Sequence, residues 1–269
     1  MSTVRSDRLR QEEQTVSKVL DHPALVIRSI PDNATIAVGG FGSCGIPSVL
    51  IDELIAHGAR DLRIVSNNCG TDGWGLGRLL EAGQIARLTA SYVGENEEFV
   101  RRYLGGELET ELIPQGTLAE RLRAGGAGIP AFFTPAGIGT VIADGGLPWR
   151  YDGEGQVAVA SPPKRIETFN GREYVLEHGI TTDFALVRAW KSDVYGNLVF
   201  RKSARNFNPL CAMAGRFTVV EAEHVLAAGE LDPDEVHLPG IFVQAVVAVP
   251  AEADKRIDRV TTRLAQVSA

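Results

Sequence analysis

Three glycines in the stretch VGGFGSCGIP, residues 38–47, have a spacing that is typical of nucleotide-binding loops. Gly40, Gly42 and Gly45 fit the pattern G-x-G-x-x-G. In a dinucleotide-binding fold, such glycines let the backbone approach a pyrophosphate at the start of a helix, and an Asp or Glu at the end of the second strand binds the ribose. The first hypothesis is therefore an NAD-dependent oxidoreductase.

The acidic residue that this hypothesis requires is missing. The second predicted strand ends in SNNCG, residues 66–70, and the first acid after it, Asp72, lies in a glycine-rich turn. The glycine pattern alone is weak evidence, because glycines also serve simply to make a tight turn between a strand and a helix. A purely structural loop and a site for another anionic ligand both stay open.

The cysteines and histidines form no recognisable catalytic or metal-binding pattern. Cys44, Cys69 and Cys211 are widely spaced, and thiols without a nearby histidine pattern do not make a zinc site. The 5 histidines are scattered, so no Ser-His-Asp arrangement is indicated. We predict no metal site and no cofactor, and the few cysteines without a signal peptide favour the cytoplasm.

The overall charge disfavours some classes of partner. With 27 basic and 34 acidic residues the net charge is -7, which argues against a broad nucleic-acid or anionic-membrane surface. No apolar run reaches the ~18 residues of a membrane-spanning helix. We expect no nucleic acid and no membrane as partners, and we expect any anionic ligand to have a local site.

The elements around the glycines predict a βαβ unit. Residues 35–38 and 62–66 are typical of buried strands. The stretch PSVLIDELIAHG between them is typical of a helix, with Pro47 in its first turn and Gly58 at its end. The glycine loop is thus expected between the carboxyl end of a strand and the amino end of a helix.

The rest of the chain alternates in the same way. Strands are predicted in IARLTASYV, ETELI, PAFFT, DFALVRAW, NLVF, FTVVEA and IFVQAVV, and helices over residues 97–104 and 118–124. Residues 166–176 predict a hairpin that turns at Asn170-Gly171. We predict an α/β fold with an open, mostly parallel sheet, flanking helices and an inserted β-hairpin.

A single domain is expected over residues 24–250. Residues 1–23 are interpreted as a polar N-terminal extension, and residues 251–269 as a polar C-terminal tail or docking helix. The stretch GGLPWRYDGEGQ, residues 145–156, has the composition of a loop-like insertion.

Several separate segments resemble the A-type (alpha) subunit of the family I CoA-transferases. They are PDNATIAVGGFGSCGIP, SNNCGTDGWGLG, SYVGENEEF, PQGTLAERLRAGGAGIPAFFTP, FNGREYVLE and RKSARNFNP, spread over residues 24–248. The resemblance implies transfer of CoA from succinyl-CoA to a 3-oxoacid such as acetoacetate. Alternatives within the family are transfer to 3-oxoadipate and an acetate/acetoacetate CoA-transferase.

The resemblance also implies that the nucleophile lies in another chain. Enzymes of this family carry CoA, as a thioester, on a glutamate of a Ser-Glu-Asn-Gly motif in their B-type (beta) subunit. No such motif occurs in these 269 residues. A CoA-transferase partner of the B type, in an A2B2 assembly, is therefore expected, with an acyl-CoA and a small carboxylic acid as substrates.

Site residues follow from the same resemblance. Residues 39–45 are assigned to CoA binding, namely Gly39, Gly40, Phe41, Gly42, Ser43, Cys44 and Gly45. The amides of Asn67, Asn68 and Gln115 are assigned to the substrate or an acyl oxygen, because they donate hydrogen bonds without adding charge. The helix start after the loop is expected to favour anionic groups. The alternative for the asparagines is that they only cap loops.

Two further groups are considered and left out of the predicted site. Glu95 resembles part of a Ser-Glu-Asn-Gly motif, but it precedes a helix, where acids favour the positive end of the dipole, so we expect a capping role. Arg201, Lys202 and Arg205 form the densest basic cluster, which we interpret as a solvated face or an interface. A non-catalytic ligand sensor of the same fold is the alternative from another class.

Overall fold

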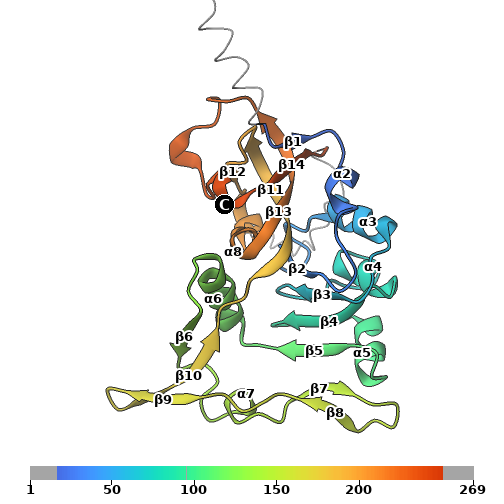
Figure 1. The fold of residues 1–269 in the computed structure, drawn as a ribbon, viewed down its shortest axis with the longest axis vertical. Helices are drawn as coiled ribbons and strands as arrows, with labels where there is room; N and C mark the ends of the chain where they lie inside the picture. Colours follow the sequence, from blue (N-terminus) through green and yellow to red (C-terminus); the bar gives the residue numbers. More distant parts are fainter. Residues whose placement is uncertain (1–16, 95, 251–269) are drawn as a thin grey trace, which may run out of the picture.

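A sheet of nine strands forms the centre of the computed structural model, which describes residues 17–94 and 96–250 (Figure 1). The strands are β1 (Val19–Leu20), β2 (Thr35–Val38), β3 (Leu62–Val65), β4 (Ile85–Ala90), β5 (Glu109–Leu112), β11 (Thr182–Asp193), β12 (Leu198–Val199), β13 (Gly215–Leu226) and β14 (Ala245–Ala248). Neighbours follow the order β1-β14-β13-β11-β2-β3-β4-β5, with β12 beside β11. Only the β11–β12 pair of this sheet is antiparallel among the described residues. The predicted open, mostly parallel sheet is confirmed.

Helices cover both faces of this sheet. On one face, α3 (Ser48–His57), α4 (Leu76–Glu81) and α5 (Glu97–Leu104) share an apolar core with Ile36 and Ile64. On the other face, α6 (Gln115–Gly126) and α8 (Asn208–Ala214) pack on Ala37 and Val65. Successive strand residues thus face opposite layers, as the alternation of a strand requires. The flanking helices of the predicted fold class are confirmed.

Shorter elements complete the described chain. They are α2 (Ala24–Ile27), α7 (Val141–Asp144) and the 3-10 turns η1 (Lys202–Arg205), η2 (Pro233–Glu235) and η3 (Gly240–Phe242). The predicted helix over residues 97–104 coincides with α5, and the one over 118–124 lies within the longer α6. Helix α3 begins one residue after Pro47 and ends before Gly58, whose φ of 80° is left-handed.

The predicted hairpin belongs to a separate small sheet. Strands β9 (Ile166–Phe169) and β10 (Arg172–His178) are antiparallel, and β10 also pairs with β6 (Ala131–Thr134). Asn170 and Gly171 have φ angles of 52° and 77°, as a tight two-residue turn requires. The hairpin is confirmed, and PAFFT forms a strand outside the main sheet.

The interpretation of residues 145–156 as a loop-like insertion is wrong in part. The stretch contains β7 (Pro148–Tyr151), which pairs with β8 (Val157–Ala160) in a second hairpin. Its aromatic residues anchor it, because the ring of Tyr151 lies 5.2 Å from that of Tyr103 in α5. Tyr103 also donates a hydrogen bond to the Pro148 carbonyl across 2.7 Å. Residues 145–147 and the turn between β7 and β8 match the expectation.

The structure describes part of the expected N-terminal extension and none of the expected C-terminal tail. Within the expected extension 1–23, Val19 and Leu20 form β1, which pairs in parallel with β14. Part of that segment therefore belongs to the sheet. The expected tail or docking helix, residues 251–269, lies outside the described residues, as do residues 1–16 and Glu95.

Candidate functional site

The carboxyl ends of neighbouring strands bring the predicted site residues together. The glycine loop, residues 39–45, follows β2, the two asparagines follow β3, and Gln115 follows β5 at the start of α6. Strands β2, β3, β4 and β5 are parallel and adjacent, so these segments meet at one edge of the sheet (Figure 1). This edge is where open α/β sheets bind ligands.

A chain of hydrogen bonds, which we call the amide network, links these strand ends. Gln115 Nε2 donates to Asn67 Oδ1 across 2.8 Å, and Ser91 Oγ donates to the same oxygen across 3.0 Å. Asn67 Nδ2 donates to Asn68 Oδ1 across 3.3 Å. The backbone N–H of Gly42 donates to that oxygen across 3.2 Å. Ser91 was missed in the sequence, although it directly follows β4, the third of these four parallel strands.

The members of the amide network differ in their access to solvent. Asn67 and Asn68 are 2% and 7% exposed, whereas Gln115 is exposed. An amide NH₂ group has two hydrogens, so Gln115 keeps one donor after it bonds Asn67. The geometry therefore favours Gln115 as a ligand contact and the asparagines as its support. Direct substrate contact by Asn67 and Asn68 stays a prediction.

The amide network contains no carboxylate, and a carboxylate beneath it is already paired. Glu111 Oε2 accepts a hydrogen bond from Thr89 in β4, and Glu111 forms ion pairs with Arg87 and Arg121 at 3.0 and 2.9 Å. Burial acts to raise the pKa of Glu111, but the two guanidinium groups outweigh it and hold that pKa below its usual value. An ion-paired carboxylate of this kind is a poor nucleophile, so the network can donate hydrogen bonds but supplies no acyl carrier.

The glycine loop is a tight turn whose amides mostly bond within the protein. Phe41 and Cys44 exchange backbone hydrogen bonds of 3.0 and 2.9 Å, and Gly39 N–H donates to the Leu186 carbonyl. Together with Gly42, four residues of the loop thus use their N–H groups internally. The Phe41 side chain, 47% exposed, is a large apolar surface at the tip. These N–H groups are therefore not free to bind a ligand, and the assignment of residues 39–45 to CoA binding stays a prediction.

The start of α3 is not open to an anionic ligand, which corrects a further expectation. Oε2 of the buried Glu221, from β13, accepts hydrogen bonds from the N–H groups of Val49 and Leu50 at 2.9 and 3.1 Å. Arg188 Nη1 lies 2.9 Å from the other oxygen. Burial raises the pKa of Glu221 to about 7, against the opposing effect of Arg188. An internal carboxylate therefore occupies the position that was expected to attract a phosphate.

The other side of the glycine loop is held by residues about 160 positions later in the chain. Asn208, fully buried, donates to the Gly45 carbonyl across 3.0 Å and accepts from the Arg188 N–H across 3.0 Å. Asn206 donates to the Cys44 carbonyl across 3.1 Å. A Cβ on Gly39 would collide with the Asn208 side chain. These contacts place η1, with part of the basic cluster, directly beside the loop.

Capping of α5 is provided by residues on both sides of Glu95, which itself lies outside the described residues. Asn96 Oδ1 accepts a hydrogen bond from Phe99 N–H across 2.8 Å. Asp72 accepts from Glu97 N–H across 3.1 Å. The predicted capping role of Glu95 stays a prediction.

The thiols lie in two kinds of environment. Cys69 and Cys211 are fully buried, and Cys44 is half-buried, with Sγ 3.2 Å from Ser203 Oγ.

Over residues 17–94 and 96–250, no group of three or more His, Cys, Asp or Glu side chains is placed to hold a metal ion. In the same ranges no helix has the length and apolar character needed to cross a membrane.

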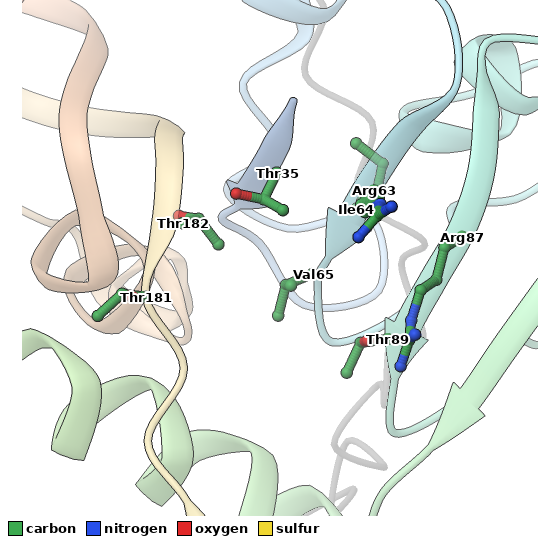
Figure 2. A pocket seen from close by; sticks show the side chains of 8 residues that line it. All are labelled: Thr35, Arg63, Ile64, Val65, Arg87, Thr89, Thr181 and Thr182. Atoms are coloured by element: carbon green, nitrogen blue, oxygen red, sulfur yellow. The ribbon is translucent and has the colours of Figure 1, made fainter. Parts of the chain in front are cut away.

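A polar cavity of about 180 Å³ lies apart from the predicted site residues (Figure 2). Its lining comes from β2, β3, β4 and the entry to β11: Thr35, Arg63, Ile64, Val65, Arg87, Thr89, Thr181 and Thr182. The hydroxyls of Thr35, Thr89 and Thr182 already donate to Asp183, Glu111 and Phe184. The cavity contains none of the amide network, so we do not assign the substrate to it.

Comparison with known proteins gives a consistent result over most of the chain. A family model described as coenzyme A transferase matches residues 21–249. The Mycobacterium tuberculosis H37Rv protein, named as the A-type subunit of a probable succinyl-CoA:3-ketoacid coenzyme A transferase, is 59% identical over 92% of this chain and 100% of its own length. The corresponding Helicobacter pylori J99 protein is 52% identical over 93% and 100%. The mouse mitochondrial succinyl-CoA:3-ketoacid coenzyme A transferase 2A is 49% identical over 90% of this chain but 46% of its own.

Solved structures agree on the fold. An acyl-CoA transferase from Escherichia coli O157:H7, in a thioester complex with CoA, has a TM-score of 0.72 and 24% identity over 87% of this chain and 47% of that chain. Glutaconate coenzyme A-transferase from Acidaminococcus fermentans has a TM-score of 0.71 and 21% identity over 87% and 76%. This chain thus spans about half of the first and three quarters of the second.

Proposed function

Since the chain belongs to the coenzyme A transferase family, we propose that it is the A-type subunit of an enzyme that moves CoA from succinyl-CoA to a 3-oxoacid such as acetoacetate. The observation that carries the substrate assignment is the 59% identity to a relative of that name over the relative's full length. No observation favours 3-oxoadipate, a dinucleotide or a sensor role. The missing ribose acid after β3 also argues against an oxidoreductase.

The partner follows from the relatives and from the chemistry of the site. Relatives of similar length carry the name of an A-type subunit, and the longer mouse chain has more than half of its length beyond the matched part. Such a length difference is consistent with two subunits fused in one polypeptide. The amide network lacks a nucleophilic carboxylate, so a B-type subunit that supplies a glutamate would complete the site. We propose an A2B2 assembly, in the cytoplasm, without a resident cofactor.

The proposed reaction uses that glutamate as the carrier. Its carboxylate attacks the thioester carbonyl of succinyl-CoA, and the C–S bond then breaks. CoA leaves as a thiolate, and a mixed anhydride of the glutamate and succinate is formed. The thiolate then attacks the glutamyl carbonyl and releases succinate, which leaves CoA on the glutamate. The 3-oxoacid carboxylate takes CoA by the reverse sequence. No proton or electron is gained or lost overall.

The amide network has a clear role in this scheme. Each addition step places negative charge on a carbonyl oxygen, and a fixed hydrogen-bond donor stabilises that charge. The free N–H of Gln115 is the exposed donor of the network, and Asn67 fixes its position. One such donor contributes on the order of 3 kcal/mol to transition-state stabilisation.

The test is co-expression with a neighbouring frame that encodes a Ser-Glu-Asn-Gly motif. The assembled enzyme should form acetoacetyl-CoA from succinyl-CoA and acetoacetate, and borohydride should trap the thioester on the partner chain. The matched control is this chain purified alone, which should transfer no CoA. Transfer by the single chain would contradict the split site, and faster transfer to 3-oxoadipate would contradict the acceptor.

A further inference from the structure

A group of three cations, which have no acidic partner among the described residues, lies beside the glycine loop. Arg201 immediately precedes η1, and Lys202 and Arg205 lie within it; we call these three residues the basic turn. All three are exposed. The contacts of Ser203 and Asn206 with Cys44 join the turn to the loop. The basic cluster, interpreted from the sequence as a solvated face or an interface, therefore borders the proposed ligand site.

We propose that the basic turn binds the phosphate groups of the CoA thioester, a proposal that rests on the proposed function of the chain. Within the described part of the chain, none of the three cations takes part in an ion pair. Glu235, an acid of η2, is paired with Lys191 at 3.4 Å. Three uncompensated positive charges on a protein of net charge -7 are a local feature that suits a polyanion.

The geometry of the turn is fixed rather than loose. The Arg201 guanidinium stacks over the Trp190 ring at 5.0 Å from its centroid, which orients it and leaves its edge for hydrogen bonds. Lys202 has a φ of 51°, a left-handed conformation that is uncommon for a residue with a side chain. Such conformations persist where the surrounding structure determines them, and they gather at ligand sites.

The occupied start of α3 favours the basic turn as the phosphate site. A helix start is the usual anion site after a glycine loop, but here Glu221 accepts from the N–H groups of Val49 and Leu50. A phosphate brought to that position would meet a buried carboxylate instead of free amides. The basic turn is the alternative source of positive charge on the same loop.

The arrangement also gives the ligand a direction. Strand β2 lies between β11 and β3, so the loop has the basic turn on its β11 side and the amide network on its β3 side. A CoA thioester carries its acyl group and its phosphates at opposite ends of the pantetheine arm. We place the acyl end at Gln115, the arm along the loop past Phe41, and the phosphates at Arg201, Lys202 and Arg205.

Kinetics of the assembled enzyme test the proposal with two donors, succinyl-CoA and succinyl-pantetheine, which lacks the nucleotide phosphates. The triple variant Arg201→Gln, Lys202→Gln, Arg205→Gln should raise KM for succinyl-CoA about tenfold or more. KM for succinyl-pantetheine, and kcat with either donor, should stay within about twofold of the wild-type values. Unchanged KM for succinyl-CoA, or an equal rise for both donors, would overturn the proposal.

A matched control removes the same charge elsewhere. The variant Arg28→Gln, Arg63→Gln, Arg172→Gln replaces three exposed arginines that form none of the ion pairs of the described residues. Arg172 lies over the Tyr174 ring, as Arg201 lies over Trp190. This control should keep the wild-type KM for succinyl-CoA. A rise equal to that of the basic-turn variant would assign the effect to net charge and overturn the proposal.

Binding of adenosine 3′,5′-bisphosphate separates failure of this proposal from failure of the proposed function. Calorimetry on the full chain should show binding that the basic-turn variant weakens about tenfold or more and the control does not. This readout needs no transfer activity. If the wild type binds but transfers no CoA with its partner, the function is wrong and the phosphate site stands. Absent or equal binding refutes the phosphate site.

Discussion

Gln115 Nε2 donates a hydrogen bond to Asn67 Oδ1 across 2.8 Å, which ties an exposed amide to a buried one. Asn67 is 2% exposed and accepts from Ser91 at the same oxygen. The exposed donor is therefore oriented by a buried side chain. The two proposed roles fall to different residues: Asn67 positions the donor, and Gln115 offers it to the ligand. Substitutions of the two residues should therefore have different effects.

We expect Gln115→Ala to lower kcat of the assembled enzyme about a hundredfold, because one oxyanion donor is lost. Its melting temperature should hardly change, since Gln115 is exposed. Asn67→Ala should lower both kcat and the melting temperature, because it removes the acceptor that positions Gln115 and the hydrogen bonds of a buried amide, while Ser91 keeps the backbone carbonyl of residue 67 as its acceptor. Gln156→Ala, at an exposed glutamine of the β7–β8 turn, is the control for both measurements. Wild-type kcat in Gln115→Ala would contradict the donor role.

Two glycines of the loop should respond differently to alanine. A Cβ on Gly40 would collide with the buried Ile46 side chain, whereas one on Gly42 would have nothing within 4 Å. Gly40→Ala should therefore lower the melting temperature more than Gly42→Ala, which should cost only about 1–2 kcal/mol for its left-handed backbone. Gly58→Ala, left-handed and equally open, is the control for that backbone term. Equal stability of the Gly40 and Gly42 variants would be the contrary result.

The buried Glu221 should leave a trace in the pH dependence of stability. Its folded pKa, raised by burial to about 7, lies above the 4.5 of an exposed glutamate. The folded state thus binds more protons between these values, and the associated stability is complete below 4.5 and lost as the pH rises through 7. The slope is at most about 1.4 kcal/mol per pH unit.

Glu221→Gln mimics the protonated carboxyl and should lack this slope. Urea unfolding across a series from about pH 5 to about pH 8 should therefore show the variant gaining stability relative to the wild type as the pH rises. Glu230→Gln is the control, because Glu230 is exposed and its carboxylate also accepts a backbone N–H. A difference that is constant with pH, or that grows in favour of the wild type, would refute the expectation.

Alkylation should distinguish the three cysteines. Burial raises the pKa of Cys69 and of Cys211 to about 12, so neither is a thiolate at mildly alkaline pH, and neither is accessible. Iodoacetamide should label the half-buried Cys44 alone in the native chain and all three after unfolding, as mass spectrometry can show. Bound CoA thioester should slow the labelling of Cys44, and Cys44→Ser should abolish it. Native labelling of Cys69 or Cys211 would count against this packing.

Local patterns predicted the elements well. The apolar residues of TIAV and LRIV, and the Asn170-Gly171 turn, act through neighbours in the chain, and the structure forms β2, β3 and the hairpin there. Helix α5 has the predicted bounds because its acidic first turn and basic last turn agree with its dipole. The placement of Asn67, Asn68 and Gln115 at one edge followed from the parallel order of the strands.

The features that the sequence did not show depend on contacts between distant residues. Glu221 bonds the start of α3 across 172 positions, and Ser203 contacts Cys44 across 159. No periodicity or motif in the sequence predicts contacts between residues so far apart. The start of α3 was therefore expected to be open, and the basic cluster was left out of the predicted site. The β7 strand was missed because its anchor, the Tyr151–Tyr103 contact, is also tertiary.

The dependence of the glycine loop on Asn206 and Asn208 also has a consequence for biosynthesis. The loop leaves the ribosome before the side chains that hold Cys44 and Gly45, which are made more than 160 residues later. Strand β2 likewise can pair with its neighbour β11 only after β11 has been made. The nascent chain therefore carries an unfinished loop until Asn206 and Asn208 have been made, and the loop reaches its final form only afterwards.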